Sequence, residues 1–238
     1  MPPWPTDGPG RRSVGLRVAT REWSLTDKST GQSDVTLDVS PGKREQTKAS
    51  NRQAILDAAR LVFAELGYGA ASVRDIIRGT QLASGTFYNY FSSKEEVFRA
   101  LLDQSALRVR PRLRAERIRA TTFEDFIRGS YRSFFDYLVS DQANFAMMRR
   151  NTGTLRVRMN TPEIVAGFDE LRSDIKQGIA QGFIPNVNAD YLTSAFIGVA
   201  FEVGDVMVQR DPPDPKGAAE FASALMLGGI AALPKMNV

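Results

Sequence analysis

The chain has 238 residues, a net charge of +4 from 31 Lys and Arg against 27 Asp and Glu, and neither His nor Cys. It therefore cannot build a Ser-His-Asp or Cys-His catalytic system, a zinc site with nitrogen and sulfur ligands, or a disulfide. The chemistry that remains rests on carboxylates, Lys, Tyr and hydroxyl groups. The composition favours a binding protein over an enzyme, and no cofactor or metal is expected.

The first 45 residues differ from the rest of the chain. They hold 10 of the 31 Gly and Pro residues and show little apolar periodicity, which predicts a disordered N-terminal extension over 1–45. One alternative is a basic arm that touches DNA, formed by Arg11, Arg12, Arg17 and Arg21. Another is a start site assigned too far upstream, with the native start at Val14, Val18, Val35 or Val39.

The chain shows no secretory signal and no membrane-spanning segment. Its longest uncharged apolar stretch, 221–233, is shorter than the roughly 20 residues needed to cross a bilayer. A cytoplasmic protein without a membrane partner is expected. Residues 46–120 carry 13 basic against 7 acidic side chains, whereas 121–238 carry 11 against 14. The basic part is expected to meet a polyanion.

A helical pattern begins at Thr47. Apolar residues recur at helical spacing from Ile55 to Leu66, and Gly67 follows as a C-cap. Ser72 and Asp75 have the spacing of a capping box, which predicts a second, short helix.

After a break near Gly79, a third short element is expected over 83–91. Ser93 to Glu96 predicts a capping box for a fourth helix, which Pro111 is expected to end. Two short helices joined by a tight turn predict a helix-turn-helix domain over 46–112, with its motif at about 72–91.

The segment that carries this motif resembles the TetR family of bacterial transcription regulators. The matching residues are Ser72-Val73-Arg74-Asp75-Ile76, Gly85-Thr86-Phe87-Tyr88-Asn89-Tyr90-Phe91 and Ser93-Lys94-Glu95, preceded by Leu66-Gly67-Tyr68. The resemblance covers 48–112. It implies an all-α fold, in which an N-terminal three-helix helix-turn-helix DNA-binding domain is followed by a larger helical ligand-binding and dimerisation domain, 113–238.

The DNA-binding residues are predicted from this motif. A recognition helix presents its N-terminal residues to base edges, while hydroxyl groups, cations and helix N-termini bind phosphates. The predicted contacts are Ser72, Arg74, Ser84, Gly85, Thr86, Tyr88, Tyr90 and Lys94. The alternative is that Ser72 only caps its helix, that Tyr88 or Tyr90 packs inside and that Arg74 is solvated. Phe87 and Phe91 are expected in the core.

Two residues depart from the family pattern. Gln81 stands in the turn where the family has Gly, and Ala83 stands where the recognition helix normally begins with Ser. A left-handed backbone at Gln81 would cost about 1 kcal/mol, and Ser84 is expected to cap the helix one residue later.

Beyond Pro111 the sequence predicts further amphipathic helices. They are expected over 123–138, from Pro162 to about Gly182, over 190–210 and over 217–233. A run of arginines spans the joint between the two domains and is interpreted as a solvated linker face, with phosphate contact or domain coupling as the alternative. It comprises Arg108, Arg110, Arg112, Arg114, Arg117 and Arg119.

An apolar effector pocket is predicted from the crowding of aromatic residues and Met in the second half, although such a stripe also fits a plain core. The predicted lining is Tyr131, Phe134, Phe135, Phe145, Met148 and Phe168. A lipophilic molecule such as an acyl chain, sterol or aromatic compound is expected. Nearby arginines are either solvated or bind an anionic head group: Arg149, Arg150, Arg156 and Arg158.

The helix over 190–210 has a narrow polar stripe, which includes Glu202 and Asp205, and is otherwise apolar or small. We expect this helix and the last one to form a two-fold dimer interface, with a buried central helix as the alternative. The predicted contacts are Phe196, Val203, Met207, Met226 and Ile230. The stripe is interpreted as solvated, the alternative being a cavity site for a cationic ligand.

These features together predict a homodimeric transcription regulator that binds double-stranded DNA at a palindromic operator. Families of this kind are most often repressors released by a small effector, although the sequence does not separate repression from activation. The alternatives are a helical enzyme using Glu202, Asp205 and Tyr side chains, and a DNA-binding protein without an effector.

Overall fold

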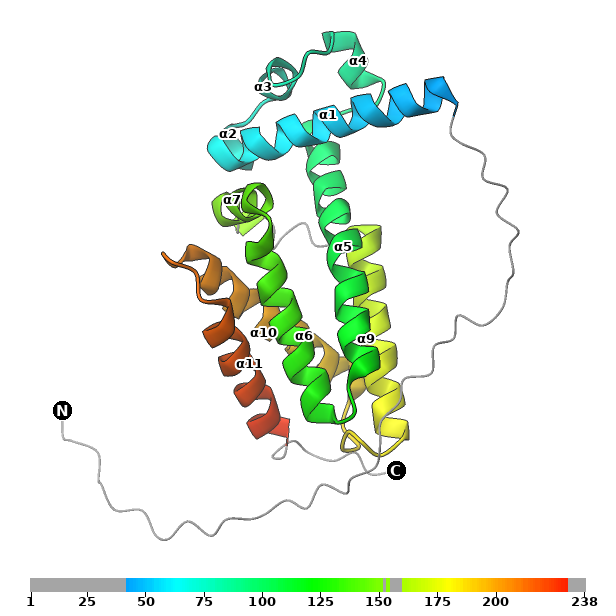
Figure 1. Ribbon diagram of the computed structural model, residues 1–238, viewed down its shortest axis with the longest axis vertical. Helices are drawn as coiled ribbons and strands as arrows, with labels where there is room; N and C mark the ends of the chain where they lie inside the picture. Colours follow the sequence, from blue (N-terminus) through cyan, green and yellow to red (C-terminus); the bar gives the residue numbers. More distant parts are fainter. Residues whose placement is uncertain (1–41, 152, 155–159, 231–238) are drawn as a thin grey trace, which may run out of the picture.

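The computed structural model describes residues 42–151, 153–154 and 160–230, which fold into an all-α protein (Figure 1). Its helices are α1 (Lys43–Glu65), α2 (Gly67–Ala70), α3 (Val73–Arg78), α4 (Ser84–Tyr88), α5 (Lys94–Arg119), α6 (Phe123–Ser140), α7 (Gln142–Arg150), α9 (Pro162–Ala180), α10 (Ala189–Gln209) and α11 (Pro215–Ile230). The predictions made for Arg11, Arg12, Arg17, Arg21, Arg156 and Arg158 and for an alternative start at Val14, Val18, Val35 or Val39 lie outside the described residues.

Local sequence signals set several helix ends. Ser72 begins α3 through a capping box with Asp75, and Thr122 begins α6 through another with Asp125. The hydroxyl of Ser72 holds the pKa of Asp75 below its ordinary value by hydrogen bonding to the carboxylate. Gly67 has a φ of +78°, a left-handed conformation that glycine adopts without a steric penalty, and it changes the direction of the chain where α1 ends and α2 begins.

The described residues form two hydrophobic cores, and Met148 of α7 packs against both. Figure 1 shows α1 lying across one end of the molecule, with α3 and α4 on its outer side and the long helices α5, α6 and α9 running away from it. The first core gathers residues of α1, α3, α4 and the beginning of α5 around Phe63, Phe87 and Phe98, all fully buried. The second lies among α6, α9, α10 and α11.

The prediction that Pro111 ends the fourth helix is wrong. α5 continues through Pro111 to Arg119, although proline removes one backbone donor at a cost of about 3 kcal/mol. Side chains on both sides of Pro111 are buried, among them Leu102, Ala106 and Arg117. This packing holds the two halves in line. A single helix therefore belongs to both cores.

Gln81 and Ala83, which depart from the family pattern, do not affect the backbone in the way the sequence predicted. Among the described residues other than glycine none has a positive φ, so Gln81 does not adopt the left-handed backbone. Thr80 holds the turn instead: its hydroxyl donates to the carbonyl of Ile77 at 2.8 Å and accepts the Leu82 N–H at 3.2 Å. The cap prediction for Ser84 is also wrong, since Ala83 occupies the N-cap position and Ser84 is the first residue of α4.

The beginning of α5 differs slightly from the predicted capping box. The Ser93 hydroxyl accepts the N–H of Glu96 at 3.2 Å, as predicted. The Glu96 carboxylate instead accepts the backbone N–H of Ser92 at 2.7 Å, and this bond lowers the pKa of Glu96. The reciprocal half of the box is therefore displaced by one residue.

α10 is long and apolar enough to cross a membrane by length and composition alone, which the sequence analysis did not anticipate. Its residues Leu192, Phe196, Met207 and Val208 belong to the second core, which it shares with α6, α9 and α11. The same composition is found in central helices of helical bundles, so this one helix carries little weight for a membrane location.

Candidate nucleic-acid interface and internal cavity

The N-terminal half of α4 lies open at the surface. Ser84 and Gly85 are exposed, Thr86 is half-buried, and Tyr88 is 60% exposed on the following turn. Phe87 and Phe91 point the other way and are buried in the first core, as predicted. The helix thus presents small residues, one β-hydroxyl and one phenol on its outer side, while Phe87 and the following Phe91 anchor it in the first core.

A basic groove lies beside α4, between the beginning of α1 and the turn that follows Tyr88. It is lined by Lys43, Arg44, Thr47, Lys48, Asn89 and Tyr90. The hydroxyl of Tyr90 accepts a long hydrogen bond of 3.4 Å from the side chain of Asn51, so the half-buried ring places its oxygen at the groove. The three cations were missed in the sequence because they fall at or beside the boundary of the extension predicted over 1–45.

Two of the predicted DNA contacts belong to α3: Arg74 lies on the helix and Ser72 is its N-cap residue. Arg74 is exposed. The exposed Ser72 has its hydroxyl bonded to the Asp75 carboxylate at 2.5 Å, so it caps its helix.

Lys94 lies against the carbonyl ends of α2, contrary to its predicted place at the phosphate surface. Its ammonium donates to the carbonyls of Tyr68, Gly69 and Ala71 at 2.8, 3.2 and 2.7 Å, and it sits 4.7 Å from the centre of the Tyr68 ring. An ammonium has three donors, and all three are used here. Lys94 therefore positions α2 against α5, and the prediction of a phosphate contact is corrected.

Asn151, which follows α7, joins the second half of the chain to α1 and α2. Its side-chain amide donates to the carbonyls of Phe63 and Met147 at 2.8 and 2.7 Å, and its oxygen accepts the Tyr68 N–H at 2.6 Å. Met147 lies in the first core, while its neighbour Met148 packs against both cores. α7 therefore links the two parts of the molecule.

A cavity of about 360 Å³ lies among α5, α6, α9 and α10, on the side of α7 away from α4. Its wall is mainly apolar. It includes the predicted residues Tyr131, Phe134, Met148 and Phe168, whereas Phe135 and Phe145 are not among its lining residues. Phe135 is fully buried in the second core, and Phe145 packs against that core.

The two tyrosines of the cavity wall are satisfied within the protein. Tyr131 stacks on Phe196, with ring centres 4.4 Å apart, and donates its hydroxyl to the Phe196 carbonyl at 3.1 Å. Tyr137 donates to the carbonyl of Ser105 at 3.1 Å. Burial raises the pKa of both phenols above the ordinary value, so both are neutral at physiological pH.

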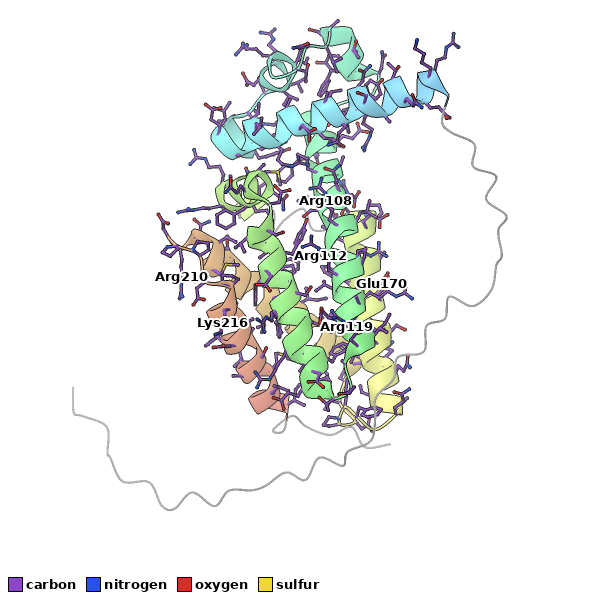
Figure 2. The ribbon with its side chains drawn as sticks, in the orientation of Figure 1. Arg108, Arg112, Arg119, Glu170, Arg210 and Lys216 are labelled. Carbon is purple, nitrogen blue, oxygen red and sulfur yellow. The ribbon has the colours of Figure 1, made fainter. Side chains whose placement is uncertain are left out.

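Four of the predicted arginines of α5 pair with carboxylates: Arg108, Arg110, Arg117 and Arg119. Arg110 pairs with Glu163 and Glu170 on α9, and Arg117 bonds to Asp174 at 2.5 Å. Arg108 pairs with Asp141 at 3.1 Å, Arg112 lies over the Tyr137 ring and Arg119 pairs with Glu116. Figure 2 shows Arg108, Arg112 and Arg119 spaced along α5 and Glu170 on the neighbouring α9. The interpretation as a solvated linker face is wrong for Arg110 and Arg117, which hold α5 to α9.

The polar residues of α10 lie at the cavity. Glu202 and Asp205 are exposed to solvent, as the first interpretation of the stripe predicted. They also belong to the cavity lining, as the alternative interpretation predicted. Arg149 and Arg150 on α7 are exposed and lie outside the lining. Among the described residues no group of three or more acidic side chains is arranged to hold a metal ion.

The predicted dimer contacts are mostly inside the subunit. Phe196, Met207, Met226 and Ile230 are buried in the second core, and Val203 is half-buried against it. The prediction is corrected for these four side chains, because they face α6 and its neighbours. The exposed apolar residues of α10 and α11 are Tyr191, Val206, Phe221 and Leu225.

Comparison with known proteins agrees with this architecture. The sequence pattern described as "Bacterial regulatory proteins, tetR family" matches residues 55–101. The chain is 27% identical over 202 residues to the HTH-type transcriptional regulator UidR of Escherichia coli K12, a match that covers 78% of this chain and 95% of that protein.

Solved structures share the fold as well. The fatty acid degradation regulator FadR from Bacillus halodurans has a TM-score of 0.65 and 26% identity, covering 76% of this chain and 96% of that one. FadR from Bacillus subtilis, solved with stearoyl-CoA, has a TM-score of 0.64 and 24% identity, covering 75% and 98%. These relatives are transcriptional regulators, and the enzyme alternative is set aside. With an exposed helix α4 beside a basic groove and a separate cavity, the chain is a DNA-binding transcriptional regulator that resembles the TetR family, whose pattern it carries over residues 55–101.

Proposed function

We propose that this protein is a cytoplasmic, homodimeric repressor that is released from a palindromic operator by a small lipophilic effector. The observation that carries the proposal is the apolar cavity of about 360 Å³, which is joined to the helix-turn-helix both by α5 and by the Asn151 contact of α7. We divide the chain into an extension over 1–45, a DNA-binding part over 46–112 and an effector part over 113–238, with α5 crossing the last boundary.

On this proposal α4 enters the major groove. Ser84, Gly85 and Thr86 approach base edges, because small side chains let the backbone come close. Tyr88 and Tyr90 bind phosphate together with Ser72 and Arg74, and the basic groove adds Lys43, Arg44 and Lys48. Binding by these cations releases counterions, so operator affinity falls as salt rises.

Thr86 and Tyr88 are expected to have different effects on DNA binding. Tyr88→Ala weakens binding to all sequences by about tenfold, since it removes a phosphate contact, whereas Thr86→Ala mainly lowers discrimination at one base pair, also by about tenfold. The measurement is selection from random DNA followed by fluorescence anisotropy on the selected and a scrambled duplex. Tyr191→Ala, which removes an exposed tyrosine from α10, is the matched control. Failure to enrich any palindrome would count against the proposal.

The effector proposal rests on the chemistry of the cavity wall. Aromatic and aliphatic side chains make up most of it, and desolvating an apolar ligand there costs nothing in unmade hydrogen bonds. That a related fold holds stearoyl-CoA in the Bacillus subtilis protein supports a ligand with an apolar chain. The described wall does not include Arg149 or Arg150, which were the candidates for an anionic head group.

The dimer proposal now uses a different face of α10 and α11. Phe221 and Leu225 lie four residues apart on α11 and are 61% and 51% exposed, and Val206 on α10 is 59% exposed. On the same side of α11, Gly228 has open space around its Cα, which suits close approach of a second helix. An exposed apolar surface of this kind is typical of an interface between subunits.

Phe221→Glu is expected to dissociate the dimer. Burying a Phe side chain contributes about 1.5–3 kcal/mol, and two-fold symmetry places the change twice in one interface, so the dimer dissociation constant should rise at least a hundredfold or so. Sedimentation velocity at micromolar concentration measures this. Leu61→Glu, at an exposed leucine of α1, is the control for adding a charge to an apolar surface position. A dimer unaffected by Phe221→Glu places the interface elsewhere.

A further inference from the structure

Two polar atoms of the cavity wall have no hydrogen-bond partner among the described residues: Ser130 Oγ and Arg110 Nε. Ser130 is only 3% exposed and lies on α6, whereas Arg110 lies on the facing helix α5. A serine inside a helix often bonds back to the carbonyl one turn earlier. Ser130 makes no such bond, and its buried hydroxyl therefore keeps an unused donor in the wall of the cavity.

The other buried polar side chains of the described wall are already satisfied. Tyr131 and Tyr137 donate to backbone carbonyls, and Ser105 is bonded to the Tyr137 hydroxyl at 2.7 Å. The terminal nitrogens of Arg110 are bonded to Glu163 and Glu170. A buried polar atom without a partner is costly, so a ligand that supplies the missing bond gains binding energy that a pure hydrocarbon does not.

The charge of the wall limits what the ligand can be. Arg110 and Arg117 are the basic residues of the described lining, and both are paired with acidic residues of α9. Four carboxylates belong to the lining, two on α9 and two on α10. An anionic head group would enter a wall in which carboxylates outnumber the guanidinium groups, and it would lose its hydration there.

We propose that Ser130 forms a polar subsite inside the effector cavity, and that the effector is an uncharged amphipathic molecule with an acceptor oxygen, such as a ketone or ester. Ser130 Oγ donates to that oxygen, and Arg110 Nε, which is only a donor, favours an acceptor at the same wall. This inference rests on the proposed lipophilic effector and specifies its polar group. A cavity of about 360 Å³ lies at the lower end of the size range of ligand pockets.

Four probes with the same carbon framework separate these chemistries: butylbenzene, butyrophenone, phenylbutanoate and phenylbutylammonium. Isothermal titration calorimetry on the full chain at neutral pH gives their affinities. We expect the ketone to bind about tenfold more tightly than the hydrocarbon, the difference expected for one buried hydrogen bond. We expect both charged probes to bind more weakly than the ketone.

Ser130→Ala tests the residue itself. The ketone should lose about tenfold in affinity, while butylbenzene binds as before, because only the hydroxyl has been removed. The variant should fold normally, since its missing atom had no partner, and urea unfolding should show unchanged or higher stability. Ser133→Ala, a half-buried position on the same helix outside the lining, is the matched control and should change neither affinity.

The outcomes distinguish this inference from the proposed function. Equal affinity of ketone and hydrocarbon, or a Ser130→Ala variant that binds the ketone as tightly as the parent, overturns the subsite and leaves the lipophilic effector standing. Tighter binding of phenylbutanoate or phenylbutylammonium than of the ketone overturns the uncharged class. If none of the four probes binds, the lipophilic effector itself fails, and the subsite with it.

Discussion

Asn151→Ala is expected to lower the free energy of unfolding by roughly 3 kcal/mol, because three hydrogen bonds of about 1 kcal/mol each are lost and buried backbone groups lose a partner. The side chain is 4% exposed, and it bonds to the backbone of Phe63, Tyr68 and Met147. Water cannot readily replace it at such a site. Urea denaturation followed by far-ultraviolet circular dichroism measures the change.

Asn151→Asp is expected to destabilise the protein more than Asn151→Ala does. A carboxylate still accepts the Tyr68 N–H but cannot donate to the two carbonyls, and it places a negative charge against them, so the loss of stability should exceed that of Asn151→Ala. Asn160→Ala, at an exposed asparagine, is the matched control and should change stability by less than about 0.5 kcal/mol. Equal effects at Asn151 and Asn160 would show that the contact between α7 and α1 contributes little.

Arg117→Met is expected to cost about 3 kcal/mol at neutral pH, since it leaves the half-buried carboxylate of Asp174 without its bonded cation, whereas Glu170 keeps its pair with Arg110. Arg117 is 4% exposed and faces Asp174 at 2.5 Å and Glu170 at 3.6 Å. Burial already raises the pKa of Asp174, and Arg117 opposes that rise. Removing the guanidinium takes away the main group that opposes the effect of burial. The pKa of Asp174 should then rise further.

The pH dependence of this variant has a definite sign. A carboxyl group whose pKa is higher in the folded than in the unfolded protein favours folding at acidic pH, and that contribution is lost as pH rises through the folded pKa. The stability deficit of Arg117→Met relative to the parent should therefore be largest at neutral pH and shrink as pH falls. Urea titrations at several pH values measure it.

Two further variants separate charge from packing at this site. Adding Asp174→Asn to Arg117→Met should recover part of the lost stability at neutral pH, because the uncompensated carboxylate is gone. Arg119→Met, two residues along the same helix and exposed, should have little effect, since its pair with Glu116 lies at the surface. A pH-independent deficit in Arg117→Met would mean that Arg117 acts through packing alone.

Local sequence patterns predicted most of the helices and the exposure of the small residues at the beginning of α4. The capping box at Ser72 and the glycine at position 67 involve only a few neighbouring residues, so they can be recognised without knowledge of the fold. The burial of Phe87 and Phe91 followed from apolar spacing for the same reason. The small, exposed residues at the beginning of α4 are also where the motif predicted them.

The remaining features depend on contacts that are distant in sequence. Asn151 bonds to residues 83 and 88 positions away, and Lys94 bonds to carbonyls at least 23 positions away, so no local pattern distinguishes either from a surface side chain. The dimer contacts were misplaced because a helix that is apolar almost all round does not show which side its own subunit covers. The prediction that Pro111 ends its helix was wrong because the cost of a proline can be read from the local sequence, whereas the packing that offsets this cost involves residues distant in sequence.

The unbroken helix α5 also has a thermodynamic consequence. Leu101 and Leu102 belong to the first core, and Val109 packs against the second, so melting α5 would expose both cores together. We therefore expect the two parts of the protein to share one cooperative unfolding transition. A ligand that binds only the folded cavity stabilises that whole unit by mass action, and the amide hydrogens of α1, α3 and α4 gain protection from solvent exchange without any contact with the ligand.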